Sequence, residues 1–257
     1  MVAMSRVCIF CHREEQALTR EHVYPNWLSK LFDPRLVGVN EVLGDNVNRV
    51  WQGAVFQQKV KLVCIECNNG WMSDIESGVK DLLTSLAFTY DGHTLSREDQ
   101  RKLSLWVQKT VLVISKSLGA ESGFDIPVGF YDQLYATKQP VNTILVTSGW
   151  RILTSGAKDQ PLASFEIKQV STLEVEKSSA DAINSQMDDG ALVWTAILAL
   201  GNVVFHVVGT SLVGQLEVGS SDPRILIQIN PYHDDLSWPR EWPLEAVGGL
   251  DALRIGM

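Results

Sequence analysis

Residues 63–71 read VCIECNNGW, in which a C-x-x-C pair is followed at once by Asn68. A second pair, CIFC, occupies residues 8–11. A tetrahedral zinc ion needs four thiolates that converge on one point, and a two-residue gap lets both sulfurs of a tight turn face one ion. The spacing therefore predicts a structural zinc site whose ligands are all the cysteines of the chain, Cys8, Cys11, Cys64 and Cys67.

Two redox-active dithiols or disulfides are the alternative use of these cysteines. Disulfides support small, secreted, loop-rich scaffolds, whereas 257 residues with 45% hydrophobic and 20% charged content are typical of a globular protein with a sizeable core. The opening residues, MVAMSR, lack the apolar run of a secretory signal. We expect a reducing, cytoplasmic setting, which suits thiolate zinc.

The net charge of −8 argues against nucleic-acid binding through bulk electrostatics, but the charge is unevenly distributed. Residues 1–80 hold nine basic and nine acidic residues, and the remaining chain holds 13 basic against 21 acidic. The part with the cysteines is therefore the plausible polyanion-facing part. Its candidates for salt-sensitive phosphate contacts are Arg13, Arg20, Lys30, Arg35, Arg49, Lys59 and Lys61.

The uncharged segment 190–216 is long enough to cross a bilayer. Gly201 and Asn202 interrupt it with a hairpin signal, and Asn202 and His206 would be costly in hydrocarbon. We expect two buried elements that meet at a turn, with residues 191–200 either a strand or a buried helix, and no membrane partner. His206 is interpreted as a core histidine.

The elements after the second cysteine pair follow from apolar periodicity. A helix is expected to open at that pair, to continue through Val79 to Phe88, and to be followed by a second helix that starts at Ser96 and Asp99. Beyond Gly119 short β-rich runs predict a sheet, with candidate strands 142–147, 151–154, 163–169, 173–175, 203–208 and 225–229. The proline- and tryptophan-rich tail, residues 230–243, is expected to pack over the sheet edge.

The candidate chemistry lies between the cysteine pairs, at Glu21, His22 and Asn68. Phosphodiester hydrolysis needs an activated water and a hydrated cation that neutralises developing charge. Adjacent residues on a strand point to opposite faces, so one of Glu21 and His22 can address the cation while the other faces the water. A neutral imidazole suits proton abstraction, and an amide oxygen next to a zinc-bound cysteine suits Mg²⁺ or Mn²⁺.

These residues give the chain a resemblance to the HNH endonucleases, the ββα-metal or treble-clef nucleases. The resemblance is carried by residues 8–11, by LTREHVYP at 18–25, and by residues 63–71, and it covers about the first 77 residues. It implies that Glu21 is a ligand of the catalytic cation, that His22 is the general base, and that Asn68 is a second ligand. It also implies that the zinc ion is a scaffold with no open coordination position.

Three positions depart from that pattern or extend it. Glu21 stands where aspartate is commoner, which lengthens the reach to the cation. Asn46 and Asn48 are equal candidates for the asparagine that orients the loop with the histidine. Glu76 either faces the site or is a solvated or helix-stabilising carboxylate, and we favour the second interpretation.

The expected fold class is α+β, with two domains. Residues 1–77 form a zinc-stapled ββα-metal (treble-clef) module, with a strand-like segment at 18–24 and a ββ hairpin inserted in the spacer. Residues 78–257 form an accessory α+β domain with helices at 79–118, a mostly antiparallel sheet at 140–230 and the proline- and tryptophan-rich tail.

Three functions remain open at this point. The first is a Mg²⁺- or Mn²⁺-dependent endonuclease that cuts DNA, with a protein partner or a second copy recruited through the accessory domain. The second is a non-catalytic treble-clef module that binds nucleic acid or protein. The third is a regulatory or interaction domain anchored by the zinc unit.

Overall fold

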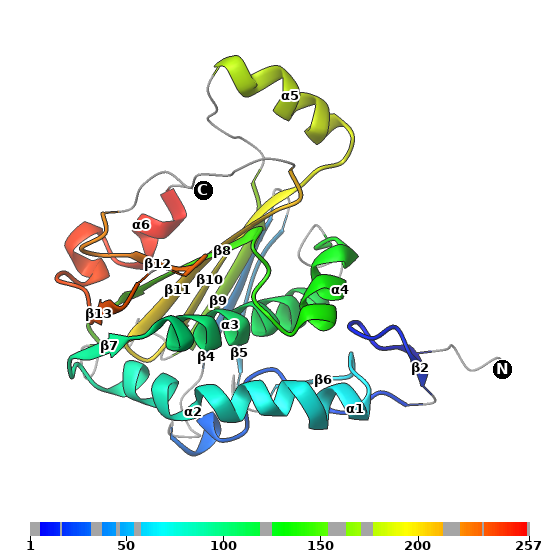
Figure 1. Cartoon of the computed structure of the whole chain (residues 1–257), viewed down its shortest axis with the longest axis horizontal. Coiled ribbons are helices and arrows are strands. Elements are labelled where there is room, and N and C mark those ends of the chain that lie inside the picture. The colour runs from blue at the N-terminus through cyan, green and yellow to red at the C-terminus, as the bar shows by residue number, and fades with distance from the viewer. Residues whose placement is uncertain are drawn as a thin grey trace.

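A seven-stranded sheet forms the centre of this α+β fold (Figure 1). The computed structural model describes residues 6–15, 17–31, 38–44, 47–53, 58–118, 125–153, 163–170, 177–212, 222–232 and 234–255. In order across the sheet the strands are β12 (Ile227–Asn230), β8 (Ile144–Trp150), β11 (Val203–Thr210), β10 (Val193–Leu200), β9 (Ala163–Gln169), β4 (Gly38–Gly44) and β5 (Val47–Gly53). Neighbouring strands are antiparallel except for β4 and β9, which are parallel.

The elements near the cysteines are short. They are β1 (Arg6–Val7), β2 (Glu14–Glu15), β3 (Glu21–His22), the 3-10 turn η1 (Leu28–Lys30) and β6 (Lys59–Val60). A helical segment follows, composed of α1 (Ile65–Cys67), a π-helical turn η3 (Asn68–Met72) and α2 (Ser73–Phe88). The helix predicted at the second cysteine pair is thus present, and the strand-like segment 18–24 is reduced to the two residues of β3.

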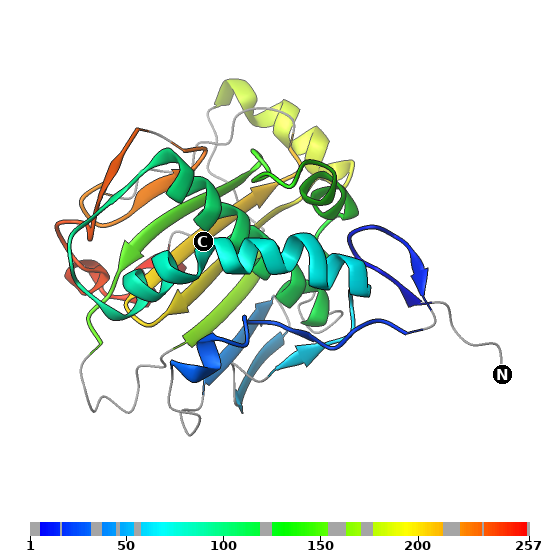
Figure 2. The same ribbon diagram turned by 60° about the horizontal axis from the view of Figure 1, so that its bottom comes forward.

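Helices cover both faces of the sheet. On one face lie α2 and α3 (Arg97–Leu118), with α4 (Val128–Thr137) beside them (Figure 2). Trp106 of α3 meets Phe205 of β11 edge to face, with ring centroids 6.4 Å apart. On the other face, apolar side chains pack against α5 (Lys177–Asp188) at one end of the strands and against η5 (Leu244–Val247) and α6 (Leu250–Ile255) at the other.

The hairpin predicted at Gly201 and Asn202 is confirmed, and residues 193–200 form a strand. Gly201 has a φ of 56°, and an added Cβ would lie 2.1 Å from the carbonyl oxygen of Ala87. Asn202 N–H donates to that same carbonyl at 2.8 Å. Only glycine fits this left-handed, closely approached position, so the turn docks the C-terminal end of α2 onto the sheet. Among the described residues, no helix has the length and apolar character to cross a bilayer.

The other strand predictions have mixed outcomes. The candidates at 142–147, 163–169, 203–208 and 225–229 correspond to β8, β9, β11 and β12, with ends shifted by a few residues. The candidate 151–154 is wrong over its described residues, because Arg151 is buried and its Nε donates to the carbonyl of Gly201 at 2.8 Å, across the hairpin turn. The candidate 173–175 lies outside the described residues.

The tail adds a separate two-stranded sheet. In it β13 (Leu236–Trp238) pairs antiparallel with β7 (His93–Leu95). The carbonyl of Arg240 accepts a hydrogen bond from the indole N–H of Trp150 at 2.7 Å, at the end of β8. The tail is therefore fixed both to the helical layer and to one sheet strand.

The predicted domain boundary after residue 77 falls inside α2. The inserted hairpin β4–β5 extends the large sheet through β9, and one cluster of buried side chains runs from Cys8 to Trp238. The boundary itself stays a prediction, but the segment with the cysteines and the sheet share a core.

Candidate metal centre and nuclease site

The first cysteine pair lies on a tight turn. His12 N–H donates to the carbonyl of Cys8 at 3.0 Å, and Cys8 N–H donates to the carbonyl of Arg13 at 3.0 Å. His12 adopts the left-handed conformation, with a φ of 54°. This closes the turn and brings the sulfurs of Cys8 and Cys11 to the same side.

The second pair lies at the start of the helical segment. Cys64 is the N-cap of α1, and its sulfur accepts a hydrogen bond from Cys67 N–H at 3.5 Å. Asn68 N–H donates to the carbonyl of Cys64 at 3.0 Å. The helix geometry thus fixes both sulfurs and the residue that follows them.

The four sulfurs converge. All lie within 4.8 Å of one another, and Cys11 Sγ is 3.5 Å from Cys64 Sγ. The four cysteines are free, and sulfurs around one zinc ion at 2.3 Å stand roughly 3.8 Å apart. The group could therefore hold a metal ion such as zinc. Among the described residues it is the one cluster of three or more histidine, cysteine or acidic ligand atoms found at such spacing.

The thiols differ in their ionisation. Burial, with the charge of Cys8 adding to it, raises the pKa of Cys64 to about 11, and burial also raises the pKa of Cys67. Burial acts in the same direction on Cys8, but hydrogen bonds from backbone N–H groups outweigh it and lower its pKa. Four thiolates this close need a cation to ionise together, which is the environment that a structural zinc ion provides.

Aromatic rings and a lysine surround the cluster. Phe10 packs edge to face on Trp71, with ring centroids 5.0 Å apart, and the Trp71 side chain opposes the rise in the pKa of Cys67 that burial causes. Lys138, at the end of α4, lies 3.4 Å from the ring centroid of Tyr135. The charges of Cys67 and Cys11 act on this lysine. The cluster is thereby joined to α4.

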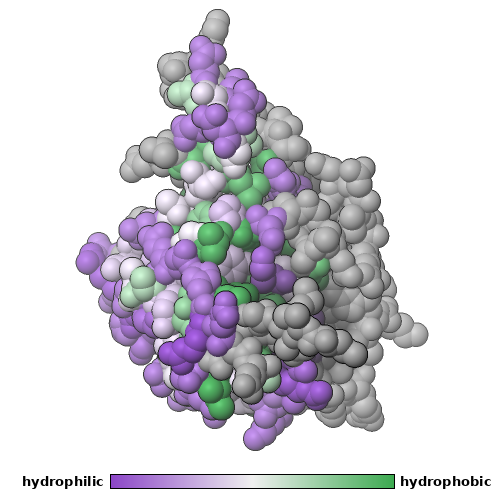
Figure 3. Space-filling model, turned by 90° about the vertical axis from the view of Figure 1, so that its right-hand side faces the viewer, coloured by the Kyte–Doolittle hydropathy of each residue, from purple (hydrophilic) through white to green (hydrophobic). Residues whose placement is uncertain are grey.

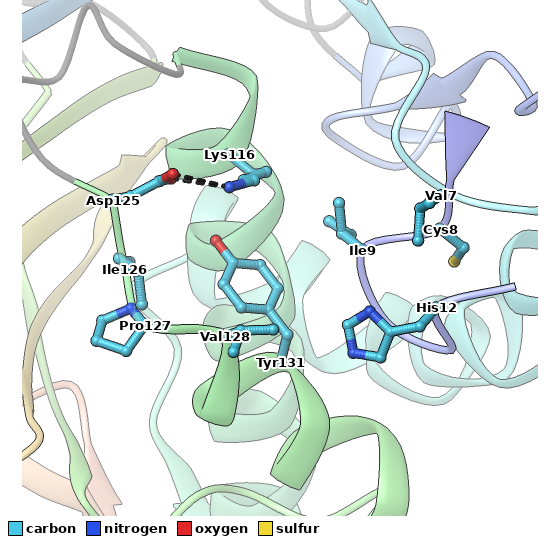
Figure 4. Close-up of a pocket in the computed structure, with 10 residues that line it drawn as sticks. All are labelled: Val7, Cys8, Ile9, His12, Lys116, Asp125, Ile126, Pro127, Val128 and Tyr131. Atoms are coloured by element: carbon cyan, nitrogen blue, oxygen red, sulfur yellow. Dashed lines mark hydrogen bonds and ion pairs between the residues drawn. The ribbon is translucent and has the colours of Figure 1, made fainter. Parts of the chain in front are cut away.

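A cavity of about 370 Å³ separates the first cysteine turn from α3 and α4 (Figure 4). Lys116 and Asp125 form an ion pair at 2.9 Å on one side of it, and His12, on the opposite side, is paired with Asp132 of α4. On this side of the molecule apolar side chains lie in small groups between hydrophilic ones (Figure 3). Val7 and Val128, which line the cavity, are exposed.

Glu21 and His22 lie on β3, which pairs antiparallel with β6. Glu21 is opposite Val60 and His22 is opposite Lys59. Glu21 is only 5% exposed, whereas His22 is partly exposed. The two side chains take the two faces of the strand, as their adjacency predicts.

Asn68 is oriented by a chain of hydrogen bonds. Its amide nitrogen donates to Thr19 Oγ1 at 3.1 Å, and Thr19 Oγ1 donates to the carbonyl of Val63 at 3.0 Å. Thr19 N–H also donates to that carbonyl, at 2.9 Å. The donor end of the amide is engaged with the segment that leads into β3, so its oxygen is the end left for a cation.

Glu76 is not a solvated carboxylate, contrary to the interpretation from sequence. Its Oε1 lies 2.7 Å from Nζ of Lys109, a lysine of α3 whose side chain is 1% exposed. Lys109 was not singled out by the sequence. The available signal was a charged residue between Val107 and Val111, within the apolar run of a core helix.

The charges of these residues act on one another. Burial raises the pKa of Glu21 to about 7, Lys109 opposes the shift and Glu76 adds to it. Burial lowers the pKa of His22, Lys59 adds to that effect, and Glu76 opposes it. Glu76 therefore acts on both predicted catalytic residues of β3. Glu21 and His22 lie on β3, and Asn68, at the start of η3, is bonded to Thr19, two residues before that strand.

Other predicted residues are less informative. Arg13 forms an exposed ion pair with Glu66 at 2.9 Å. Asn46 and Arg35 lie outside the described residues, and the side chains of Asn48 and Arg49 lie outside them too. His206 lies half-buried in β11 with its ring bonded to Thr195 Oγ1 at 2.9 Å, and desolvation lowers its pKa to about 4, which agrees with the interpretation as a core histidine.

No protein-family model matches the sequence, and no curated protein or solved structure matches the chain.

Proposed function

We propose that the protein is an HNH-type endonuclease that hydrolyses DNA phosphodiester bonds. In this proposal His22 is the general base, and a Mg²⁺ or Mn²⁺ ion is held by Glu21 and Asn68. One observation carries it. A buried carboxylate and a partly exposed imidazole occupy adjacent positions of one strand, on its two faces, and Asn68, at the head of the following helix, is bonded to Thr19 just before that strand. The arrangement is strand, antiparallel strand and helix, with the sulfur cluster at the helix start.

Each residue has a defined chemical task. His22, neutral at physiological pH because its pKa is lowered, accepts the proton of the attacking water. Lys59 stands opposite it on β6 and contacts the phosphate. Glu21 and the Asn68 amide oxygen offer the hard oxygen ligands that Mg²⁺ and Mn²⁺ prefer. The cation, when bound, supplies charge neutralisation at the phosphate and the leaving oxygen.

The test is plasmid cleavage by the zinc-loaded chain across Mg²⁺, Mn²⁺ and no added cation. Wild type is expected to cut only with a divalent cation. His22→Ala is expected to lower the rate by about 10²-fold or more, the usual contribution of a general base, and Asn68→Ala to require more cation.

Matched controls separate catalysis from folding. His93→Ala removes a histidine of β7 that is bonded to Ser85 of α2. Asn142→Ala removes an exposed asparagine. Both are expected to cut like wild type. All four variants should hold one zinc ion per chain by elemental analysis. Normal cutting by both His22→Ala and Asn68→Ala would refute the catalytic assignment.

A non-catalytic zinc module is the second candidate, and a specific observation favours it. Lys109 and Glu76 already pair within the core, beside the buried Glu21, so these charges can serve the fold alone. This candidate predicts DNA or protein binding that is indifferent to Mg²⁺ and Mn²⁺ and to His22→Ala.

A further inference from the structure

Three charged side chains from three elements meet where the zinc-bearing segment joins the helical layer. Lys109 comes from α3, Glu76 from α2 and Glu21 from β3. The Lys109 side chain is 1% exposed, the Glu76 side chain is 20% exposed, and Glu21 is 5% exposed. Buried charges are costly unless they are paired, so this placement needs a reason beyond surface solvation.

The charges of the group do not balance. One ammonium contacts Glu76 at 2.7 Å and acts on Glu21, while Glu76 acts on Glu21 as a like charge. With both carboxylates ionised the group carries one surplus negative charge. That surplus faces the region that also holds His22, on which Glu76 acts as well.

We propose that Lys109 is a positioning residue of the cation site: its ammonium engages Glu76 and so leaves the buried Glu21 carboxylate as the single anionic ligand. This inference rests on the proposed function. Lys109 touches neither substrate nor cation in this account and acts through Glu76.

The arrangement has a chemical consequence. A divalent cation with one carboxylate and one amide ligand keeps several bound waters and most of its charge for the phosphate. A second carboxylate would bind the cation more tightly but would neutralise it further. Of the three residues, Lys109 lies outside residues 1–77, so the cation site would depend on α3 of the accessory part.

The experiment is calorimetric titration of Mn²⁺ into the full-length, zinc-loaded chain, paired with cleavage rates at saturating Mn²⁺. Lys109→Met frees Glu76 and is expected to tighten Mn²⁺ binding by about tenfold or more while slowing cleavage. Glu76→Gln releases the ammonium toward Glu21 and is expected to weaken binding by a similar factor. The double variant Lys109→Met with Glu76→Gln is expected to bind nearly as wild type does. Lys109→Arg keeps the charge and should preserve wild-type affinity.

The outcomes distinguish this inference from the proposed function. If Glu21→Gln abolishes Mn²⁺ binding but Lys109→Met and Glu76→Gln bind like wild type, the inference is overturned and the nuclease proposal stands. If wild type binds no Mn²⁺ that Glu21→Gln removes, the proposed function fails and the inference falls with it. Should Lys109→Met not fold by circular dichroism, Glu76→Gln decides alone, since its partly exposed side chain can be replaced without a cavity.

Discussion

The thiolate cluster and the carboxylate site are neighbours along one helical segment, yet they differ in the source of positive charge. The four cysteines, fully ionised, would set four negative charges against the ammonium of Lys138, which acts on Cys11 and Cys67. Glu21 and Glu76 set two against the buried ammonium of Lys109. The first group therefore requires an ion to reach its ionised form, whereas the second group carries a surplus of only one negative charge. We therefore expect a tightly held structural ion at the first group, and we propose an exchangeable one at the second.

Removal of the ion from the thiolate cluster should have the largest effect. Structural zinc ions bind with about 10–16 kcal/mol in small modules, and much of that energy is folding energy. Cys64→Ser is expected to lose the zinc ion and to lower the thermal unfolding midpoint sharply. Elemental analysis and calorimetry measure both quantities. An unchanged midpoint after complete chelation would break the distinction between the two regions.

The stability of the folded chain should depend on pH through the carboxylate site when Mg²⁺ and Mn²⁺ are absent. The pKa of Glu21 is raised from 4.5 to about 7 by burial, so the folded chain binds this proton more readily than the unfolded chain. The stability that this proton contributes is fully present below about pH 4.5 and is lost as the pH rises through about 7.

Glu21→Gln, which cannot ionise, should therefore gain stability relative to wild type between pH 4.5 and pH 8, by roughly 3 kcal/mol. Urea unfolding at several pH values measures the gain. Glu14→Gln, an exposed change on β2, is the control. If the difference in unfolding free energy between Glu21→Gln and wild type is the same at pH 4.5 and at pH 8, ionisation of Glu21 does not destabilise the folded chain.

The features that sequence predicts well here depend on local spacing. The cysteine pairs bring their sulfurs together through short turns, and Ser96 and Asp99 form the predicted cap, with Ser96 N–H bonded to Asp99 Oδ2 at 3.0 Å. The hairpin at Gly201 depends on two residues. In each case the residues that decide the geometry are adjacent in the chain.

The features that sequence does not predict depend on contacts between distant segments. The parallel pairing of β4 with β9 joins residues 39–40 to 164–165, and no local pattern encodes that partner. Helices α4 and α5 have weaker or more polar patterns and were not predicted. The pairing of Lys109 is not predicted for the same reason, because its partner Glu76 lies on another helix.

In a plot of cleavage rate against pH, the acidic limb should be shifted to low pH. His22 must be neutral to accept a proton, and burial and Lys59 hold its pKa below the ordinary 6.5. The cleavage rate is therefore expected to fall only as the pH drops below about 6.5, with Mn²⁺ saturating at each pH. Lys59→Gln removes one cause of the shift and should move the limb upward, by up to about one pH unit. Lys61→Gln, an exposed neighbour, should leave it in place; an identical effect of both changes would point to substrate binding instead.

The smallest effect is expected at the surface of the zinc segment. Arg13 and Glu66 pair at 2.9 Å with side chains that are 55% and 56% exposed. Such pairs contribute little in water, so Arg13→Ala should change the free energy of unfolding by less than about 1 kcal/mol. A loss comparable to that of a buried pair would show that this arginine supports the cysteine turn more than its exposure suggests.

The proposed nuclease site requires a second, exchangeable cation that binds beside the thiolate cluster, between Glu21, His22 and Asn68. The most direct measurement is Mn²⁺ titration of zinc-loaded wild type, Glu21→Gln and Asn68→Ala, with plasmid cleavage followed in the same samples. The account predicts one Mn²⁺ per wild-type chain, cleavage that rises with its occupancy, and weaker binding in both variants with the zinc content unchanged. Equal Mn²⁺ binding by all three proteins, or cleavage that is independent of Mn²⁺ occupancy, would contradict it.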